Sequence, residues 1–524
     1  MKSKKNKHLN SHYDVVIVGS GLGGLVSAII LAMEGKSVCV LEKNNQYGGN
    51  LQTFVRNKTI FDTGVHYIGG LDEGQNLYQY FKYLDVLKDL NLEKLDEEGF
   101  DIVTFDNDPI EYKHAQGYKK FIEVLVEQFP EEETAIIAYC KKLRETCDSF
   151  PLYNLKQGKP YYDDTATMQL PAKAYIDSIT DNKTLQAVLA GTNFLYAGDS
   201  ERTPFYVHAL TVNSYIESSY RCVNGGSQIT KALIKRLKEH GGETYKHHNV
   251  VDFGFEDGKI TSAICANGNE IKGDLFISNI EPKLTLKLVG EDKFRKSYTN
   301  RVDKIESTIA AFSLYIVLKP NTFKYQNKNF YHFRNPDRVW DVHKYTEESW
   351  PEGYMMSMAI KKNMGEYGDN VTVMTYMHYD ELKPWADTFN TVASKNERGQ
   401  TYEQFKAEKA EKLIKELELK FPNIRDCIQE MYTSTPLSYR DYIGSNRGSM
   451  YGYVKDVNRP MQSFISPRTK IKNLLFTGQS LNMHGILGVT IGAVMTCSEI
   501  IGKNYLLNKV LKANGEEEIT ETNV

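Results

Sequence analysis

YDVVIVGSGLGGLVSAIILAMEGKSVCVLE, residues 13–42, is the stretch that decides the fold of this chain. Its run of apolar, mostly β-branched residues at 15–18 is typical of a parallel strand that is buried on both faces. Gly19, Gly21 and Gly24 then lead from that strand into a helix. In such a turn the first glycine permits the tight bend, the second lets the backbone approach a pyrophosphate, and the third allows close packing of helix and strand. The N–H groups at the start of the helix would bind the phosphates.

An acidic residue completes this unit. A second strand, 37–41, ends at Glu42, at the spacing where a carboxylate accepts the hydroxyls of an adenosine ribose. Glycines alone also mark ordinary turns, but here the strand, the helix and the acid agree. The stretch therefore predicts a Rossmann-type α/β domain that binds a dinucleotide, and it leaves the choice between NAD and FAD open.

Composition argues against several other classes of protein. The 524 residues are 41% hydrophobic and 25% charged, as in ordinary globular proteins of more than one domain. A formal net charge of −3 gives no electrostatic basis for binding nucleic acid. The seven cysteines are dispersed without a CxxC pair, which indicates a reducing compartment and no metal site. The basic segment 1–12 runs into the first strand without an apolar signal segment, so we expect a cytoplasmic protein.

The segment 473–498 near the C-terminus has no charged side chain apart from His484. Its first half is polar, whereas a membrane-spanning helix needs about 20 predominantly apolar residues. We therefore expect a buried strand that ends at Gly478 and a helix that begins near Gly488. A second glycine turn so far from the first suits FAD, a cofactor too long for one βαβ unit. The positive end of the second helix would then lie near the flavin ring.

The remaining chain divides by its hydrophobic pattern. The region 77–204 shows helical periodicity broken by turns and predicts an inserted cap, and 291–469 mixes strands with one long helix. That helix should begin with a capping box at Thr401 and end at Pro422. We expect a discontinuous cofactor domain (13–76, 205–290 and 470–506), a substrate or cap domain (77–204 and 291–469) and flexible tails (1–12 and 513–524).

The motifs resemble, in order and along almost the whole chain, those of the phytoene-desaturase-like flavoproteins, and within them most resemble the branch of retinol saturase and carotenoid isomerase. The resemblance rests on VVIVGSGLGGL (15–25) with Glu42, on Gly48 and Gly49, and on DTGVHYIGG (62–70), VNGGSQI (223–229), GDLFISNIEP (273–282) and FTGQSLNMHGILGVTIGAV (476–494). It implies a discontinuous FAD-binding domain of the glutathione-reductase type, interleaved with an α+β substrate domain that covers the isoalloxazine ring. Asn224 departs from the family, which often has proline there.

The resemblance also assigns the cofactor contacts. FAD would be held by Gly19, Ser20, Gly21, Leu22, Gly24, Glu42, Lys43, Gly49, Asn50, Val65, Val250, Asn279, Gly478, Gln479, Gly488, Val489 and Thr490. Among these, Val250 would meet the adenosine portion through its backbone. The chain has no second Gly-x-Gly-x-x-Gly motif. NAD(P)H, if it is the reductant, would therefore bind only transiently or act through another protein.

The substrate implied by the resemblance is an apolar polyene or another isoprenoid lipid. The 34 Tyr and 23 Phe residues are compatible with flat walls for such a ligand, although aromatic residues more often form plain core. Hydride transfer belongs to flavin N5, so the protein supplies position, a dry site and, for saturation, a proton. Saturation, desaturation and cis/trans isomerisation all remain open, and the motifs around 62–70 and 480–491 favour saturation. An amine oxidase fits these motifs less well.

Three side chains are candidate proton donors: His66, Tyr67 and His484, all on loops expected near the flavin. An equal alternative for the two histidines is that they only hydrogen-bond the cofactor or a nearby carbonyl group. Asp62 is expected to satisfy backbone N–H groups in its turn. His247 and its neighbour in the sequence are expected on opposite faces of a strand and so cannot form a joint metal site.

Two further hypotheses concern partners. A Rab-GDP dissociation inhibitor has the same two-domain architecture without flavin and escorts prenyl lipids, but the intact glycine motif with Glu42 argues against that role here. A substrate dissolved in a bilayer would favour peripheral membrane contact through a hydrophobic mouth on the cap and the lysines of 1–12. The oligomeric state is left open.

Overall fold

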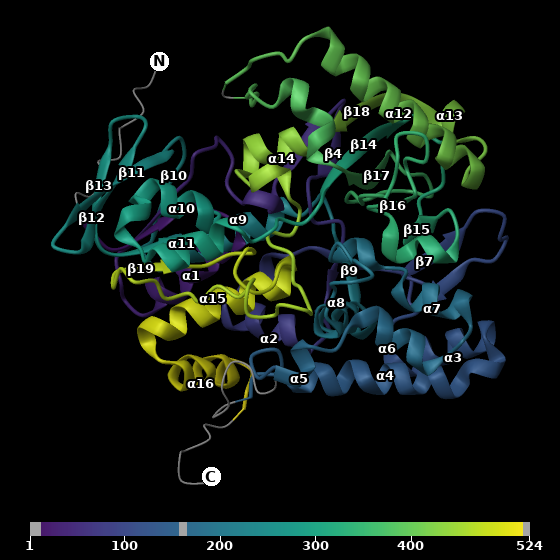
Figure 1. The fold of residues 1–524 in the computed structure, drawn as a ribbon, viewed down its shortest axis with the longest axis horizontal. Helices are drawn as coiled ribbons and strands as arrows, with labels where there is room; N and C mark the ends of the chain where they lie inside the picture. Colours follow the sequence, from purple (N-terminus) through teal and green to yellow (C-terminus); the bar gives the residue numbers. More distant parts are fainter. Residues whose placement is uncertain (1–11, 157–164, 393, 517–524) are drawn as a thin grey trace.

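Two large sheets organise the chain. The computed structural model describes residues 12–156, 165–392 and 394–516. In Figure 1 the first sheet lies at the left and the second at the upper right, with a group of helices below the second sheet. The predicted tails lie almost wholly outside the described residues, and so do the lysines invoked for membrane contact.

The first sheet has seven strands built around the predicted βαβ unit. Its order is β10 (Glu243–Tyr245), β2 (Val38–Leu41), β1 (His12–Val18), β13 (Glu270–Ser278), β12 (Lys259–Cys265) and β11 (Val250–Glu256), with β19 (Leu474–Phe476) also paired to β13. β1 is parallel to both β2 and β13. β19 extends the parallel part of the sheet from a point about 200 residues further along the chain than β13.

Alternation along β1 explains why this sheet is buried on both faces. Val15 and Ile17 join the hydrophobic cluster that contains helix α1 (Leu22–Met33), whereas Val16 and Val18 join the cluster on the opposite face. α1 is buried along nearly its whole length and packs against α15 (Gly485–Ile501) and α9 (Ser227–Glu239). The opposite face is covered by α10 (Pro282–Val289) and α11 (Lys296–Asp303).

The second sheet also has seven strands and is mostly antiparallel. Its order is β18 (Ile428–Ser434), β14 (Ala310–Leu318), β17 (Asn370–Met377), β16 (Gly353–Ser357), β15 (Asn329–Phe333), β7 (Asp101–Phe105) and β8 (Tyr112–His114). The long helix α12 (Gln400–Lys420) packs on one face through Leu413 and Leu417. Below the second sheet in Figure 1 lie α3 (Tyr118–Gln128), α4 (Glu133–Asp148), α6 (Ala172–Ile179), α7 (Lys183–Ala190) and α8 (Phe205–Glu217).

The strands of the two sheets follow the expected division of the chain. Every strand of the first sheet comes from a segment predicted for the cofactor domain, and every strand of the second from a segment predicted for the substrate domain. A small sheet of β5 (Ile68–Gly69), β9 (Ser219–Cys222) and β6 (Leu92–Lys94) joins the two kinds of segment. The mixed α/β fold is confirmed, and the exact domain boundaries stay a prediction.

Three local expectations are wrong. α12 begins at Gln400 with Gly399 as its N-cap and no side-chain cap, because the helix starts one residue before Thr401 and so places that residue in its first turn. α15 begins at Gly485 rather than near Gly488. His247 and His248 lie in a loop, where His247 has a φ of 57° and the two backbone N–H groups donate to the carbonyls of Asn44 and Glu42.

The uncharged segment near the C-terminus forms β19 and α15, as expected, and α15 is buried against α1. Within residues 12–156, 165–392 and 394–516, no helix combines the length and the hydropathy needed to cross a membrane.

Candidate functional site

A long cavity extends from the carboxyl ends of the first-sheet strands to the face of the second sheet. One end of the cavity is formed where β1, β2, β13 and β19 stop, the position at which open parallel sheets bind ligands. We call it the nucleotide end, because the sequence predicts a dinucleotide there. The other end is formed by side chains of β15, β16 and β17. One cavity is therefore shared by the two sheets.

The glycine turn after β1 is closed by backbone contacts. α1 has Gly21 as its N-cap, and no side chain of the described residues caps its first N–H groups. A Cβ on Gly24 would lie 2.3 Å from the carbonyl oxygen of Gly19, and one on Gly23 would lie 2.7 Å from Oδ1 of Asn279. Gly24 is therefore required for packing and does not line the cavity, whereas the residues before it do.

Asn279 joins the two glycine turns. Its backbone N–H donates to the carbonyl of Val18 at 2.9 Å, and its Nδ2 donates to the carbonyl of Gly19 at 3.3 Å. A Cβ on Gly478 would lie 2.7 Å from Oδ1 of Asn279. The side chain therefore lies between the first turn and the turn after β19, in the wall of the cavity.

Glu42 is held in place at the end of β2. Only 5% of its surface is exposed, and it accepts hydrogen bonds from the backbone N–H and the hydroxyl of Ser20, at 3.2 and 2.5 Å, and from the N–H of Asn44 at 2.8 Å. The neighbouring Lys43 donates to the carbonyl of Asp441 at 3.0 Å, and burial lowers the pKa of its ammonium group. The carboxylate thus lies in the cavity wall beside the glycine turn.

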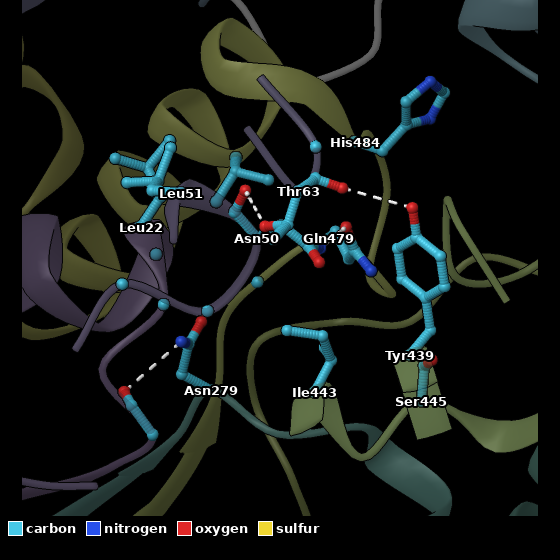
Figure 2. Close-up of a pocket in the computed structure, with 18 of the residues that line it drawn as sticks. Leu22, Asn50, Leu51, Thr63, Asn279, Tyr439, Ile443, Ser445, Gln479 and His484 are labelled. Atoms are coloured by element: carbon cyan, nitrogen blue, oxygen red, sulfur yellow. Dashed lines mark hydrogen bonds between the residues drawn. The ribbon is translucent and has the colours of Figure 1, made fainter. Parts of the chain in front are cut away.

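Three distant segments meet at the centre of the cavity (Figure 2). Asn50 donates through Nδ2 to Oε1 of Gln479 at 3.2 Å, and the hydroxyl of Tyr439 donates to the carbonyl of Thr63 at 3.1 Å. Gly49 approaches the first turn so closely that its Cβ would lie 3.2 Å from Cα of Gly21. The loop after the first βαβ unit therefore lies directly on the glycine turn.

The start of α15 forms another part of the wall. His484 is the N-cap, and its side chain makes no cap hydrogen bond. The positive end of the helix faces the cavity through Gly485, Ile486 and Val489. Of the predicted turn at 488–490, only Val489 lines the cavity, because the helix starts three residues earlier.

Several polar atoms in the wall lack a partner. Thr477 Oγ1, Ser445 Oγ and Glu281 Oε1 are buried and accept or donate no hydrogen bond within the described part of the chain. Burial also raises the pKa of Glu281. Buried polar groups are normally satisfied, so these three indicate a polar ligand at the nucleotide end.

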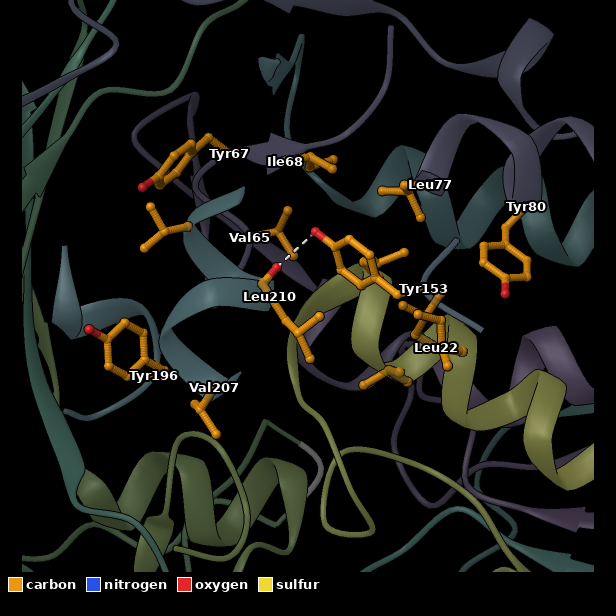
Figure 3. Close-up of a cluster of buried hydrophobic side chains, with 14 of the residues drawn as sticks. Leu22, Val65, Tyr67, Ile68, Leu77, Tyr80, Tyr153, Tyr196, Val207 and Leu210 are labelled. Atoms are coloured by element: carbon orange, nitrogen blue, oxygen red, sulfur yellow. Dashed lines mark hydrogen bonds between the residues drawn. The ribbon is translucent and has the colours of Figure 1, made fainter. Parts of the chain in front are cut away.

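The far end of the cavity is apolar and aromatic. Its wall includes Val65, Phe194, Tyr215, Tyr331, Met355, Met374 and Met450. Val65 and Tyr67 lie beside the large buried cluster shown in Figure 3, which reaches Leu22 at the start of α1. Flat rings and flexible thioethers are suited to an elongated apolar ligand.

Tyr67 is part of a buried hydrogen-bond network. Its hydroxyl donates to Oδ2 of Asp101 at 2.8 Å and lies 2.7 Å from the hydroxyl of Tyr331, while Asn329 donates to Oδ1 of Asp101 at 2.8 Å. Burial raises the pKa of Tyr67 well above its usual value and raises the pKa of Asp101 to about 7. Tyr67 is therefore a neutral hydroxyl beside a carboxyl group that titrates near neutrality.

The two candidate histidines are neutral near pH 7. Burial, followed by the positive charge of Arg221, lowers the pKa of His66 to about 4. Burial also lowers the pKa of His484 to about 4. Nε2 of His484 donates to the carbonyl of Leu195 at 3.0 Å, and its ring contacts that of Tyr451 in a tilted arrangement with centroids 4.5 Å apart. Neither imidazole holds a second proton at that pH.

Most predicted site residues lie together in this cavity wall, and Gly24, Gly488 and Thr490 do not. Asp62 accepts from the N–H of Gly226 at 2.6 Å, so it joins two loops rather than satisfying only its own turn. The sequence interpretation missed Tyr439 and the aromatic and methionine residues of the second sheet. Alternation of apolar and polar residues would have been the signal in the sequence, and it is absent from β15, β16 and β17 because these strands are buried on both faces.

Comparisons with known proteins agree with this architecture. Residues 17–84 match a family model described as an NAD(P)-binding Rossmann-like domain. All-trans-retinol 13,14-reductase of Rattus norvegicus is 27% identical over 534 aligned positions, which cover 94% of this chain and 86% of that protein. Chloroplastic prolycopene isomerase of Daucus carota is 24% identical over 93% of this chain and 80% of its own length.

Solved structures give the same fold at lower identity. An oxidoreductase from Methanosarcina mazei has a TM-score of 0.60 at 14% identity, covering 91% of this chain and 98% of its own. Putrescine oxidase has a TM-score of 0.60 at 13% identity, covering 94% of this chain and 99% of its own. The resemblance inferred from the motifs is therefore confirmed: along nearly its whole length this chain is similar to the retinol saturase and carotenoid isomerase branch of the phytoene-desaturase-like proteins.

Proposed function

We propose that the protein is an FAD-dependent oxidoreductase that acts on the conjugated double bonds of an apolar polyene. The observation that carries the proposal is the single cavity, which joins the glycine turn and Glu42 at one end to an apolar, aromatic wall at the other. The names of the relatives, retinol reductase and prolycopene isomerase, support a retinoid-like or carotenoid-like substrate.

The residues at the nucleotide end fit FAD. The uncapped start of α1 would hold the pyrophosphate, and Glu42 would accept the ribose hydroxyls. The positive end of α15 would lie toward the ring system. The unpartnered oxygens of Thr477, Ser445 and Glu281 offer hydrogen bonds to polar groups of the cofactor. Bound FAD would supply hydride transfer at N5 of its isoalloxazine ring.

The apolar end would orient the substrate and exclude water from it. For saturation, a proton must reach the carbon that does not receive hydride. We assign that proton to Tyr67, because both histidines are neutral near pH 7 and Tyr67 lies in the cavity wall. Asp101 lies behind it and, with a pKa of about 7, can return a proton to the tyrosine near neutral pH.

The direction proposed is saturation, with isomerisation as the second candidate because a relative named prolycopene isomerase matches almost the whole chain. Purified protein should be yellow. When anaerobically reduced protein is mixed with retinol or a carotenoid, saturation shifts the polyene absorbance to shorter wavelength as the flavin reoxidises. An unchanged chromophore with altered chromatographic retention would instead indicate isomerisation. Desaturation requires the oxidised protein and shifts the absorbance to longer wavelength.

The flavin-free escort is the contrasting possibility. It predicts a colourless protein that stays colourless after incubation with FAD yet still binds prenyl lipids. That result would refute the enzyme proposal. NAD(P)H as a transient reductant stays a prediction, since the described residues form one Rossmann-type sheet, in which β1, β2, β10, β13 and β19 are parallel.

A further inference from the structure

A second cavity of about 470 Å³ adjoins the first and differs from it in chemistry. We call it the polar chamber, and its size falls within the range of small-molecule sites. Its wall has more cationic than acidic side chains. The five cations are Arg202, Lys283, Lys304, Arg447 and Lys455, and the three carboxylates are Asp199, Asp303 and Glu306. The chamber thus carries an excess of positive charge.

The two cavities meet at one pair of rings. His484 and Tyr451 line both cavities, and their rings are in contact. Both are tied to the short helix η4 (Asn193–Leu195), because the hydroxyl of Tyr451 donates to the carbonyl of Phe194 at 2.7 Å and His484 donates to that of Leu195. A ligand that occupied both cavities would pass beside this pair.

Most charges in the polar chamber are already paired. Arg202 contacts Asp199 and Glu306, Asp199 also contacts His343, and Arg447 contacts Asp380, which lies outside the chamber. These pairs neutralise one another and leave little affinity for a ligand.

Three cations of the chamber form no ion pair within the described residues: Lys283, Lys304 and Lys455. Lys304 is exposed, and the ammonium group of Lys283 donates to the carbonyl of Ile305 and lies over a tyrosine ring. Nζ of Lys455 donates only to the carbonyls of Leu481 and Ser463, at 3.1 and 3.4 Å. Burial lowers the pKa of this ammonium group to about 7. An ammonium group has three N–H donors, so one remains for a ligand.

A second donor in the same wall also lacks a partner. Tyr376, on β17, is 1% exposed, and its hydroxyl makes no hydrogen bond to any described residue. Its ring lies 4.6 Å from that of Phe194, next to the boundary between the cavities. A buried hydroxyl without a partner in a cavity wall indicates a ligand acceptor.

We propose that the polar chamber binds the carboxylate end of an elongated polyene acid, with Lys455 and Tyr376 as its donors, while the apolar chain extends past His484 and Tyr451 into the first cavity. This inference rests on the proposed function and specifies the class of substrate. A carboxylate has one charge and two acceptor oxygens, which suits the ammonium group of Lys455 and the free hydroxyl of Tyr376.

The test is an equilibrium binding measurement that uses the fluorescence of parinaric acid, a C18 fatty acid with a conjugated tetraene. Its methyl ester is the uncharged probe. Wild-type holoprotein should bind the acid about tenfold or more tightly than the ester, since a hydrogen bond to a charged group is of that strength. Lys455→Met should abolish this preference and leave ester binding unchanged, and Lys455→Arg should retain most of it.

Two controls keep the result interpretable. Lys119→Met removes the same charge from a side chain that is 93% exposed on α3 and should change neither affinity. Tyr376→Phe removes a hydroxyl that has no partner, so it should leave the melting temperature unchanged and still weaken acid binding. If Lys455→Met does not fold, the acid affinity of Tyr376→Phe tests the polar-chamber proposal in its place.

The outcomes separate the two proposals. Equal binding of acid and ester by wild type, or unchanged acid binding in both Lys455→Met and Tyr376→Phe, would overturn the polar-chamber proposal and leave the oxidoreductase proposal standing. Failure of yellow, folded protein to bind either probe, or any retinoid or carotenoid, would count against both.

Discussion

The two ends of the first cavity are built by different means. At the nucleotide end the contacts come largely from backbone: glycines that allow atoms within 3 Å of a Cβ position, and helix N–H groups without side-chain caps. At the apolar end they come from side chains such as Tyr331, Met355 and Met374, which stand on three different strands. Backbone geometry tolerates almost no substitution, whereas an apolar wall can be rebuilt from other residues of similar volume.

This difference implies that the cofactor end is fixed and the substrate end is adjustable. Substitutions should therefore have all-or-none effects at the first end and graded effects at the second. Three changes test this contrast, beginning with the largest expected effect.

Gly24→Ala should abolish flavin binding. The added Cβ would lie 2.3 Å from a backbone oxygen of Gly19, so α1 must move away from the turn, at a cost of about 3 kcal/mol or more. The measurement is the flavin absorbance of the purified protein together with its melting temperature. Gly492→Ala is the matched control, because nothing lies within 4 Å of that position in α15 and alanine should stabilise the helix by up to ~1 kcal/mol. A fully yellow Gly24→Ala protein would break the comparison.

Tyr67→Phe should lower turnover about 100-fold while flavin content and substrate affinity stay unchanged, because it removes the assigned proton donor and retains the ring. Steady-state kinetics at several pH values measure this effect. Tyr80→Phe is the control: Tyr80 is also buried and its hydroxyl donates to the carbonyl of Leu152, yet it does not line the cavity. Turnover of Tyr67→Phe within about twofold of wild type would show that the proton comes from another group.

Asp101→Asn should change the pH dependence of stability. Burial raises the folded-state pKa of both Asp101 and Asp62 from 3.8 to about 7, so the folded protein holds protons that the unfolded chain has released. The contribution of each of these two groups to the free energy of unfolding should therefore fall as pH rises from about 4 to 7, with a slope of at most about 1.4 kcal/mol per pH unit. Buried histidines such as His66 and His484, whose pKa values burial lowers, contribute in the opposite direction. In urea titrations Asp101→Asn should therefore remove the contribution of Asp101 alone, and the slope of stability against pH should become more positive than that of the wild type by up to about 1.4 kcal/mol per pH unit. An unchanged slope would mean that Asp101 is ionised throughout this range.

Much of the nucleotide end could be predicted from the sequence because its determinants are local. The turn after β1, Glu42 after β2 and the turn after β19 each follow a recognisable strand, and all three lie in the cavity wall. The position of Gly488 was mistaken for a helix start because glycines at 485 and 488 offer two possible starts, and only the structure shows that the first one is used.

The apolar end could not be predicted in the same way. Met355 and Met374 are adjacent across two antiparallel strands, and Tyr331 is on a third, but nothing in the sequence states which strands pair. Because β15, β16 and β17 are buried on both faces, their residues do not alternate between apolar and polar. Tyr67 was predicted only because it lies within the recognised motif at 62–70, and its link to Asp101 is a contact between separate segments.

The pairing of β19 with β13 and of α15 with α1 also bears on how the protein is made. A ribosome must add about 200 residues after β13 before β19 exists, and until then the buried face of α1 lacks its principal helical partner. Such late, long-range contacts fold slowly and leave apolar surface exposed in the meantime. Incomplete chains would therefore lack both a closed cofactor site and a covered α1, which would mark them for chaperones and proteases before they could act as enzymes.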